Sequence, residues 1–234
     1  MARLPRLELA DRLHLVVQRG RTGEAVFVDD DDRRRYLGAL LESSRECAVA
    51  VHAYALMDDG VLLLATPGKP DALSRCIQAL GRRYVKAFNH RHGRRGALWE
   101  GRYRTTVLDP ASQLLTCIRL IEQAPVRQGL AVRTNDWPWS SAAHHVGQRR
   151  DAIVTEHPAY WQLGNTPFER EARHLRESAL PLKDQEVERL LTAARQGWPV
   201  GPEAFLRELA EATNRPLRPR LRGRPPRRKA SDFI

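Results

Sequence analysis

The chain has 234 residues, and its hydrophobic fraction of 42% is enough for one substantial core, which excludes a wholly disordered protein. Its 39 lysines and arginines outnumber 28 aspartates and glutamates, giving a formal net charge of +11 that favours a nucleic-acid partner. No apolar run has the length of a membrane span, and the three widely spaced cysteines are typical of reduced thiols, so we expect a cytoplasmic protein.

Strand and helix signals alternate along the first part of the chain. Residues 13–19 predict a strand, and the acidic residues at 29–32 mark the start of a helix that runs to about residue 46. Strands are predicted at 49–57 and 61–66, joined by an Asp-Asp-Gly turn. The remaining elements are a helix after Pro70 with apolar residues at helical spacing, a basic loop at 90–96, a strand at 102–108 and a helix at 110–122 that Pro125 ends.

This order, β-α-β-β-α-β followed by one more helix, predicts an α+β fold, a ferredoxin-like split βαβ sandwich over residues 1–145. Composition then predicts an irregular linker at 146–183, a helical hairpin at 184–213 and a disordered basic tail at 214–234. The helical extension is compatible both with a DNA-reading helix-turn-helix and with a plain helical hairpin.

Six short segments between residues 2 and 141 resemble, in this order and spacing, the REP-associated tyrosine transposases, the single-tyrosine branch of the HUH nucleases. They are residues 2–6, 18–20, 51–57, 98–104, 125–130 and 136–141. The resemblance implies binding of short palindromic DNA hairpins. It also implies DNA transposition by single-strand cleavage and strand transfer. That chemistry needs a divalent cation, magnesium or manganese, held by two strand histidines, and a helix tyrosine with a polar metal-shell residue one turn later.

The chain departs from this family pattern at all four chemical positions. Gly60 and Leu62 stand where the resemblance implies the two histidines, Leu120 stands for the tyrosine and Ala124 for the metal-shell residue. None of these side chains can ligate a cation or attack phosphorus. We therefore expect no catalytic residue, no metal and no cofactor, and a pseudoenzyme that binds DNA without cutting it.

Two alternatives stay open. The first is an active transposase or single-strand endonuclease with substituted residues, using a metal site rebuilt from Asp58, Asp59 and Glu122 or a replacement nucleophile at Tyr84 or Tyr103. The second is a decayed protein-interaction module without a DNA role.

The histidines are expected to differ in their surroundings. His52 is expected to be packed and hydrogen-bonded, whereas phosphate contact or solvation suits His90, His92, His144 and His145 better than metal binding.

The DNA-binding prediction rests on arginines interleaved with aromatic residues, because these combine phosphate neutralisation with stacking surfaces. We expect the ligand to be single-stranded hairpin repeat DNA, and a homodimer is consistent with the resemblance. An Arg-Gly-Arg-Pro sequence at 222–225 further resembles a minor-groove hook. The predicted DNA-binding residues are Arg19, Arg21, Arg75, Arg82, Arg83, Lys86, Arg91, Arg94, Arg95, Trp99, Arg102, Tyr103, Arg104, Arg222 and Arg224.

Overall fold

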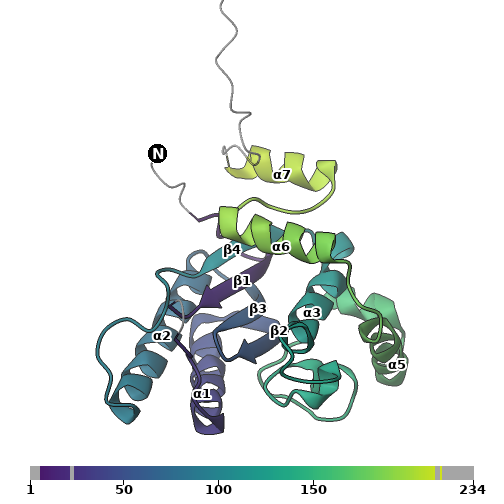
Figure 1. The fold of residues 1–234 in the computed structure, drawn as a ribbon. Coiled ribbons are helices and arrows are strands. Elements are labelled where there is room, and N and C mark those ends of the chain that lie inside the picture. Colours follow the sequence, from purple (N-terminus) through teal and green to yellow (C-terminus); the bar gives the residue numbers. More distant parts are fainter. Residues whose placement is uncertain (1–5, 22–23, 214–216, 218–234) are drawn as a thin grey trace, which may run out of the picture.

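The computed structural model describes residues 6–21, 24–213 and 217 and contains a four-stranded antiparallel sheet (Figure 1). The strands are β1 (Leu13–Arg19), β2 (Val49–Met57), β3 (Gly60–Pro67) and β4 (Arg104–Leu108), in the order β2-β3-β1-β4. Since β3 pairs antiparallel with both β1 and β2, those two strands run parallel, and helix α1 (Asp30–Cys47) connects them. Helix α2 (Ala72–Arg91) connects β3 to β4 around β1 in the same way. The predicted α+β, split βαβ fold is confirmed.

Helices cover both faces of the sheet, and its strands are therefore buried almost throughout (Figure 1). Successive strand residues point to opposite faces. The pair Val16 and Leu63 lies in the core under α1 and α2. The neighbouring pair Leu15 and Leu64 lies in the core under α3 (Pro110–Arg127) and α6 (Asp184–Gln196). The layout therefore leaves no open sheet face, and any functional surface lies at strand ends, on helices or in loops.

Local sequence signals explain where the helices begin. The Asp29 carboxylate caps α1 by accepting hydrogen bonds from the backbone amides of Asp31 and Asp32, and three acids follow in the first turn. Asp109 caps α3, where Pro110 takes the first position, at which a missing amide hydrogen costs nothing.

Two helices extend beyond their predicted ends. Helix α3 continues through the buried Pro125 to Arg127, because a proline in the last turn removes one hydrogen bond while the Gln128 amide still bonds the Ala124 carbonyl at 3.1 Å. Helix α2 likewise continues to Arg91, so the start of the predicted basic loop is helical. Both differences reflect packing, which local breaker signals do not report.

The segment predicted as an irregular linker is largely structured. It contains a 3₁₀ helix (Pro158–Leu163) and α5 (Pro167–Ser178), which follow the short helix α4 (Ala142–His145) and a 3₁₀ turn at Thr134–Asp136. Thr166 and Glu169 form a capping box at the start of α5. Tyr160 and Leu182 are buried in the same core as α3. The prediction of an irregular segment is wrong here, because Pro158 and Pro167 start helices instead of breaking them. The division of the chain at residue 145 stays a prediction.

The C-terminal helices pack on the edge of the sheet. Helix α6 contacts β4 and β1, and Val200 forms a parallel bridge with Leu108. Helix α7 (Glu203–Thr213) buries Phe205 and Leu209 in a third cluster with Leu7 and Val107. Over the described residues, no helix combines the length and apolar character that a membrane crossing requires. The predicted basic tail lies outside the described residues except for Leu217.

Candidate nucleic-acid interface

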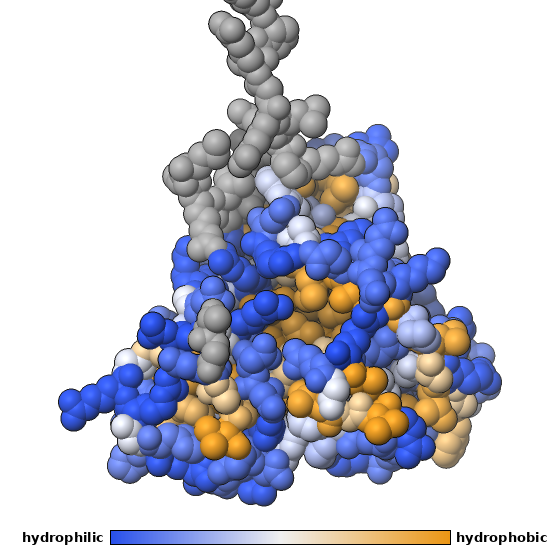
Figure 2. Space-filling view, viewed as in Figure 1, coloured by the Kyte–Doolittle hydropathy of each residue, from blue (hydrophilic) through white to orange (hydrophobic). Residues whose placement is uncertain are grey.

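The four positions that the family resemblance assigns to the metal ligands and the nucleophile line one cavity of about 140 Å³. Gly60 and Leu62 contribute from β3, and Leu120 and Ala124 contribute from α3, four residues apart and therefore on one helix face. Helix α6 closes the cavity with two apolar side chains, Val187 and Leu191. Figure 2 shows an apolar area in this part of the molecule, between α6 and the strands, surrounded by hydrophilic residues.

The Asp59 carboxylate is the one metal-ligand type of side chain among the described residues that line the cavity, and it stands there without a second acid or a histidine. Among the described residues, no histidine, cysteine or tyrosine lines the cavity, and its polar lining consists of Gln18, Arg19, Asp59, Arg127 and Gln128, with Val17, Met57 and Val61 completing the apolar lining. Gly60 is also sterically constrained: a Cβ atom there would lie 2.7 Å from the Gln18 carbonyl oxygen, closer than such atoms pack.

The acids proposed for a rebuilt metal site are not brought together. Asp58 pairs with Arg33 outside the cavity, and Asp59 lies at the cavity wall. Glu122 is fully buried and accepts hydrogen bonds from His145 and His174.

The two candidate replacement tyrosines are packed in the interior. The Tyr84 hydroxyl donates to the Val26 carbonyl, and the Tyr103 hydroxyl donates to Glu8. Burial raises the pKa of both hydroxyls far above the usual value. A tyrosine that resists ionisation and has no access to solvent is a poor nucleophile.

A second, charged cavity of about 290 Å³ adjoins the first and shares Val17, Arg19 and Leu191 with it. Its charged lining residues are Arg19, Arg104, Arg195, Glu100 and Glu188. Arg195 pairs with Glu188, whereas Arg19 and Arg104 have no ion pair among the described residues. The end of β1 and the start of β4 therefore present two arginines without a direct ion pair, although Glu100 and Glu188 line the same cavity and Arg19 lies within electrostatic range of Glu188.

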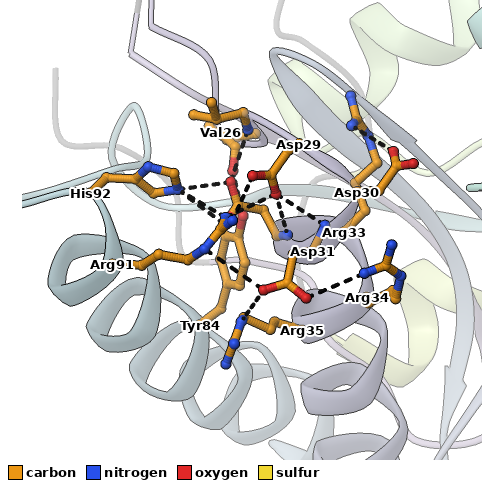
Figure 3. A network of polar contacts seen from close by, with 12 residues as sticks. Val26, Asp29, Asp30, Asp31, Arg33, Arg34, Arg35, Tyr84, Arg91 and His92 are labelled. Atoms are coloured by element: carbon orange, nitrogen blue, oxygen red, sulfur yellow. Dashed lines mark hydrogen bonds and ion pairs between the residues drawn. The ribbon is translucent and has the colours of Figure 1, made fainter.

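The predicted DNA-binding cations fall into two groups in the structure. Arg83 pairs with Glu46 at 2.6 Å, and Arg94 pairs with Glu24. Arg91 bonds both Asp29 at 2.6 Å and the fully buried Asp32 at 2.7 Å (Figure 3). In the described part of the chain, the others form no ion pair and all but Arg104 are exposed; they are Arg19, Arg21, Arg75, Arg82, Lys86, Arg95, Arg102 and Arg104.

Figure 3 shows how Arg91 is held in place. The acids at the start of α1 face the end of α2, and Arg91 reaches across to them. The Arg91 guanidinium holds the pKa of Asp29 well below its usual range. His92 joins the network through a 2.9 Å contact with Asp32. This network fastens α2 to α1, so its cations are already neutralised within the molecule.

The two aromatic residues predicted to stack on bases are packed against other protein groups. Trp99 is half-buried, with its ring 6.3 Å from those of Tyr36 and Tyr84. Tyr103 is buried beneath the Arg6 guanidinium, 3.9 Å from the ring centroid. Arg222 and Arg224 lie outside the described residues.

Several histidines differ from expectation, because His92 bonds Asp32 and His144 accepts a hydrogen bond from the Asp151 amide. His52 is buried and bonded to the Thr155 carbonyl at 2.7 Å, which confirms the packed interpretation. His145, expected in a solvated basic loop, is instead buried in α4 and bonded to Glu122 at 2.6 Å. His174 on α5 completes this buried cluster. No sequence spacing signals it, because its three residues come from three separate helices.

No protein-family model matches the chain, and no curated protein matches it in sequence. Solved structures that are similar to it include two transposases. One is a REP-associated tyrosine transposase bound to a REP hairpin, with a TM-score of 0.53 and 18% identity over 68% of this chain and 96% of that chain. The other is a candidate transposase from Deinococcus radiodurans R1, with a TM-score of 0.35 and 20% identity over 55% of this chain and 95% of that chain. The first likeness shows that the chain has a transposase-like fold.

Proposed function

We propose that this protein binds hairpin or single-stranded repeat DNA and does not cleave it. The observation that carries the proposal is the cavity between β3 and α3, where Gly60, Leu62, Leu120 and Ala124 meet and offer neither metal ligand nor nucleophile. The unpaired Arg19 and Arg104 lie beside that cavity and can neutralise phosphate. The structural neighbour bound to a REP hairpin supports a folded hairpin as the ligand class.

The exposed side of α2 supplies further cationic groups. Arg75, Arg82 and Lys86 lie seven and four residues apart along the helix and are exposed. Spacings of about one and two turns place such side chains on one side of a helix. Unpaired cations on one side of a helix can contact the phosphates of a nucleic-acid backbone and provide affinity without reading bases.

The test is a paired assay on labelled hairpin oligonucleotides, with the linear duplex of the same stem as comparison. Gel shifts at several salt concentrations report binding, and denaturing gels with magnesium or manganese report cleavage and covalent adducts. We expect salt-sensitive hairpin binding and intact DNA. Arg19→Ala with Arg104→Ala should weaken binding more than Arg195→Ala, which removes an arginine already paired with Glu188. Metal-dependent cleavage would contradict the proposal, as would affinity that does not fall with salt.

A further inference from the structure

Glu122, His145 and His174 form a buried polar cluster on the far side of α3 from the cavity lining. They come from α3, α4 and α5, and their exposed fractions are 0%, 3% and 0%. His145 Nδ1 lies 2.6 Å from Glu122 Oε1, and His174 Nε2 lies 2.8 Å from Glu122 Oε2. The two imidazole rings stack with centroids 4.9 Å apart. Three ionisable groups from distant parts of the sequence thus converge on one interior point.

No lysine or arginine stands beside the carboxylate of this cluster. Within the described residues, Glu122 bonds Ser141, His145 and His174 and no lysine or arginine. Buried carboxylates in proteins are paired with a cation or coordinate a metal ion, and the two imidazoles beside this one supply nitrogen ligands for a metal.

We propose that Glu122, His145 and His174 bind a zinc ion that fastens α4 and α5 to α3. Two imidazole nitrogens and one carboxylate oxygen are a ligand set that zinc accepts, and one ligand atom from each of the three residues lies within 4.8 Å of the others. Ligands about 2.1 Å from a tetrahedral ion lie about 3.4 Å apart, so the atoms that are now hydrogen-bonded need to separate by roughly 0.6 to 0.8 Å. Each imidazole then carries its proton on the other ring nitrogen.

The surroundings of Glu122 support a metal site. The Ser141 hydroxyl donates to Glu122 Oε1 at 2.8 Å and accepts from the Tyr54 amide at 3.2 Å, which orients the carboxylate as outer-shell partners do in metal sites.

Tyr160 offers a place for the fourth ligand. Its ring packs 5.2 Å from His145 and 5.8 Å from His174, and its hydroxyl is buried without a partner among the described residues. A buried hydroxyl left without a hydrogen bond is costly. A water molecule in the open fourth position of the zinc ion would give this hydroxyl a partner.

The test uses the full chain purified without a polyhistidine tag and stripped with a chelator. Zinc alone and cobalt(II) alone are the probes. We expect one ion per chain, a rise in melting temperature with zinc, and the visible ligand-field absorption of four-coordinate cobalt. The pair His145→Gln and His174→Gln keeps an amide that can donate to Glu122 but is a poor zinc ligand, and it should weaken zinc binding at least about 100-fold.

The matched control replaces two histidines outside the ligand set, His144→Gln and His157→Gln, and should leave zinc affinity unchanged. Equal zinc binding by the wild type and the His145→Gln, His174→Gln variant would overturn the proposal and leave a proton-held triad. Should that variant fail to fold, the wild type decides alone. Cobalt absorption together with zinc stabilisation supports the site, because an ion bound only to the native state raises the melting temperature. The lack of either signal overturns it.

Discussion

The division of the basic residues into paired and unpaired groups can be tested with two double variants of equal charge. The first, Arg82→Ala with Lys86→Ala, removes exposed cations of α2 that form no ion pair in the described structure. The second, Arg83→Ala with Arg91→Ala, removes two cations of the same helix that are paired with carboxylates. Both variants lose two positive charges, so a general charge effect acts on them equally.

The expected size follows from counter-ion release. Each phosphate contact contributes about 0.9 to the slope of the logarithm of affinity against the logarithm of salt concentration. Loss of two contacts therefore lowers the slope by about 1.8 for a duplex stem, and extrapolation from 1 M to about 0.15 M salt gives a roughly 30-fold loss of affinity. The variant Arg83→Ala with Arg91→Ala should lose less than half as much slope and affinity, because the guanidiniums that it removes bond Glu46, Asp29 and Asp32 in the wild type.

The assay is fluorescence anisotropy on a labelled hairpin over a series of salt concentrations. Thermal unfolding is measured on both variants, because the loss of Arg91 leaves the buried Asp32 with a weaker network. At temperatures where both are folded, equal reductions in slope would refute the reasoning. Such a result would mean that net charge, rather than the unpaired cations of α2, governs binding.

Three further predictions concern the fold. Gly60→Ala should destabilise the protein by about 1–3 kcal/mol, because its Cβ would meet the Gln18 carbonyl oxygen at 2.7 Å. The control Gly81→Ala within α2, where a Cβ meets nothing, should stabilise the protein by up to about 1 kcal/mol. Urea unfolding measures both variants, and equal effects would contradict the close approach at Gly60. Leu190 in α6 is 0% exposed, so Leu190→Ala should lower the free energy of unfolding by about 2–5 kcal/mol. Leu180 is 57% exposed, so Leu180→Ala should lower it by less than about 0.5 kcal/mol. A mild effect of Leu190→Ala would show that α6 does not pack as described. Burial lowers the pKa of His14 from 6.5 to about 4 in the folded protein. Between these pH values the unfolded chain binds more protons than the folded one. The free energy of unfolding should therefore fall by about 3 kcal/mol as the pH falls from 6.5 to about 4. The variant His14→Gln should flatten this pH dependence relative to the exposed His90→Gln, and an unchanged slope would rule out His14 as its source.

The sequence by itself determined the strand and helix order, since its signals are local. Alternation marks β2, the Asp-Asp-Gly turn joins it to β3, and Asp29 and Asp109 cap the two helices that follow them. The family resemblance also gave the four positions that meet at the cavity, because residues two apart on a strand and four apart on a helix share a face.

Only the tertiary structure decided which charges are available and which residues converge. Arg82 and Arg83 are neighbours in the sequence, yet one is free of carboxylates and the other pairs with Glu46, because α1 lies beside only one side of α2. Glu122, His145 and His174 are far apart in the chain and meet only when α4 and α5 pack against α3. Ion pairing and burial depend on distances between elements, and local sequence patterns carry no information about those distances.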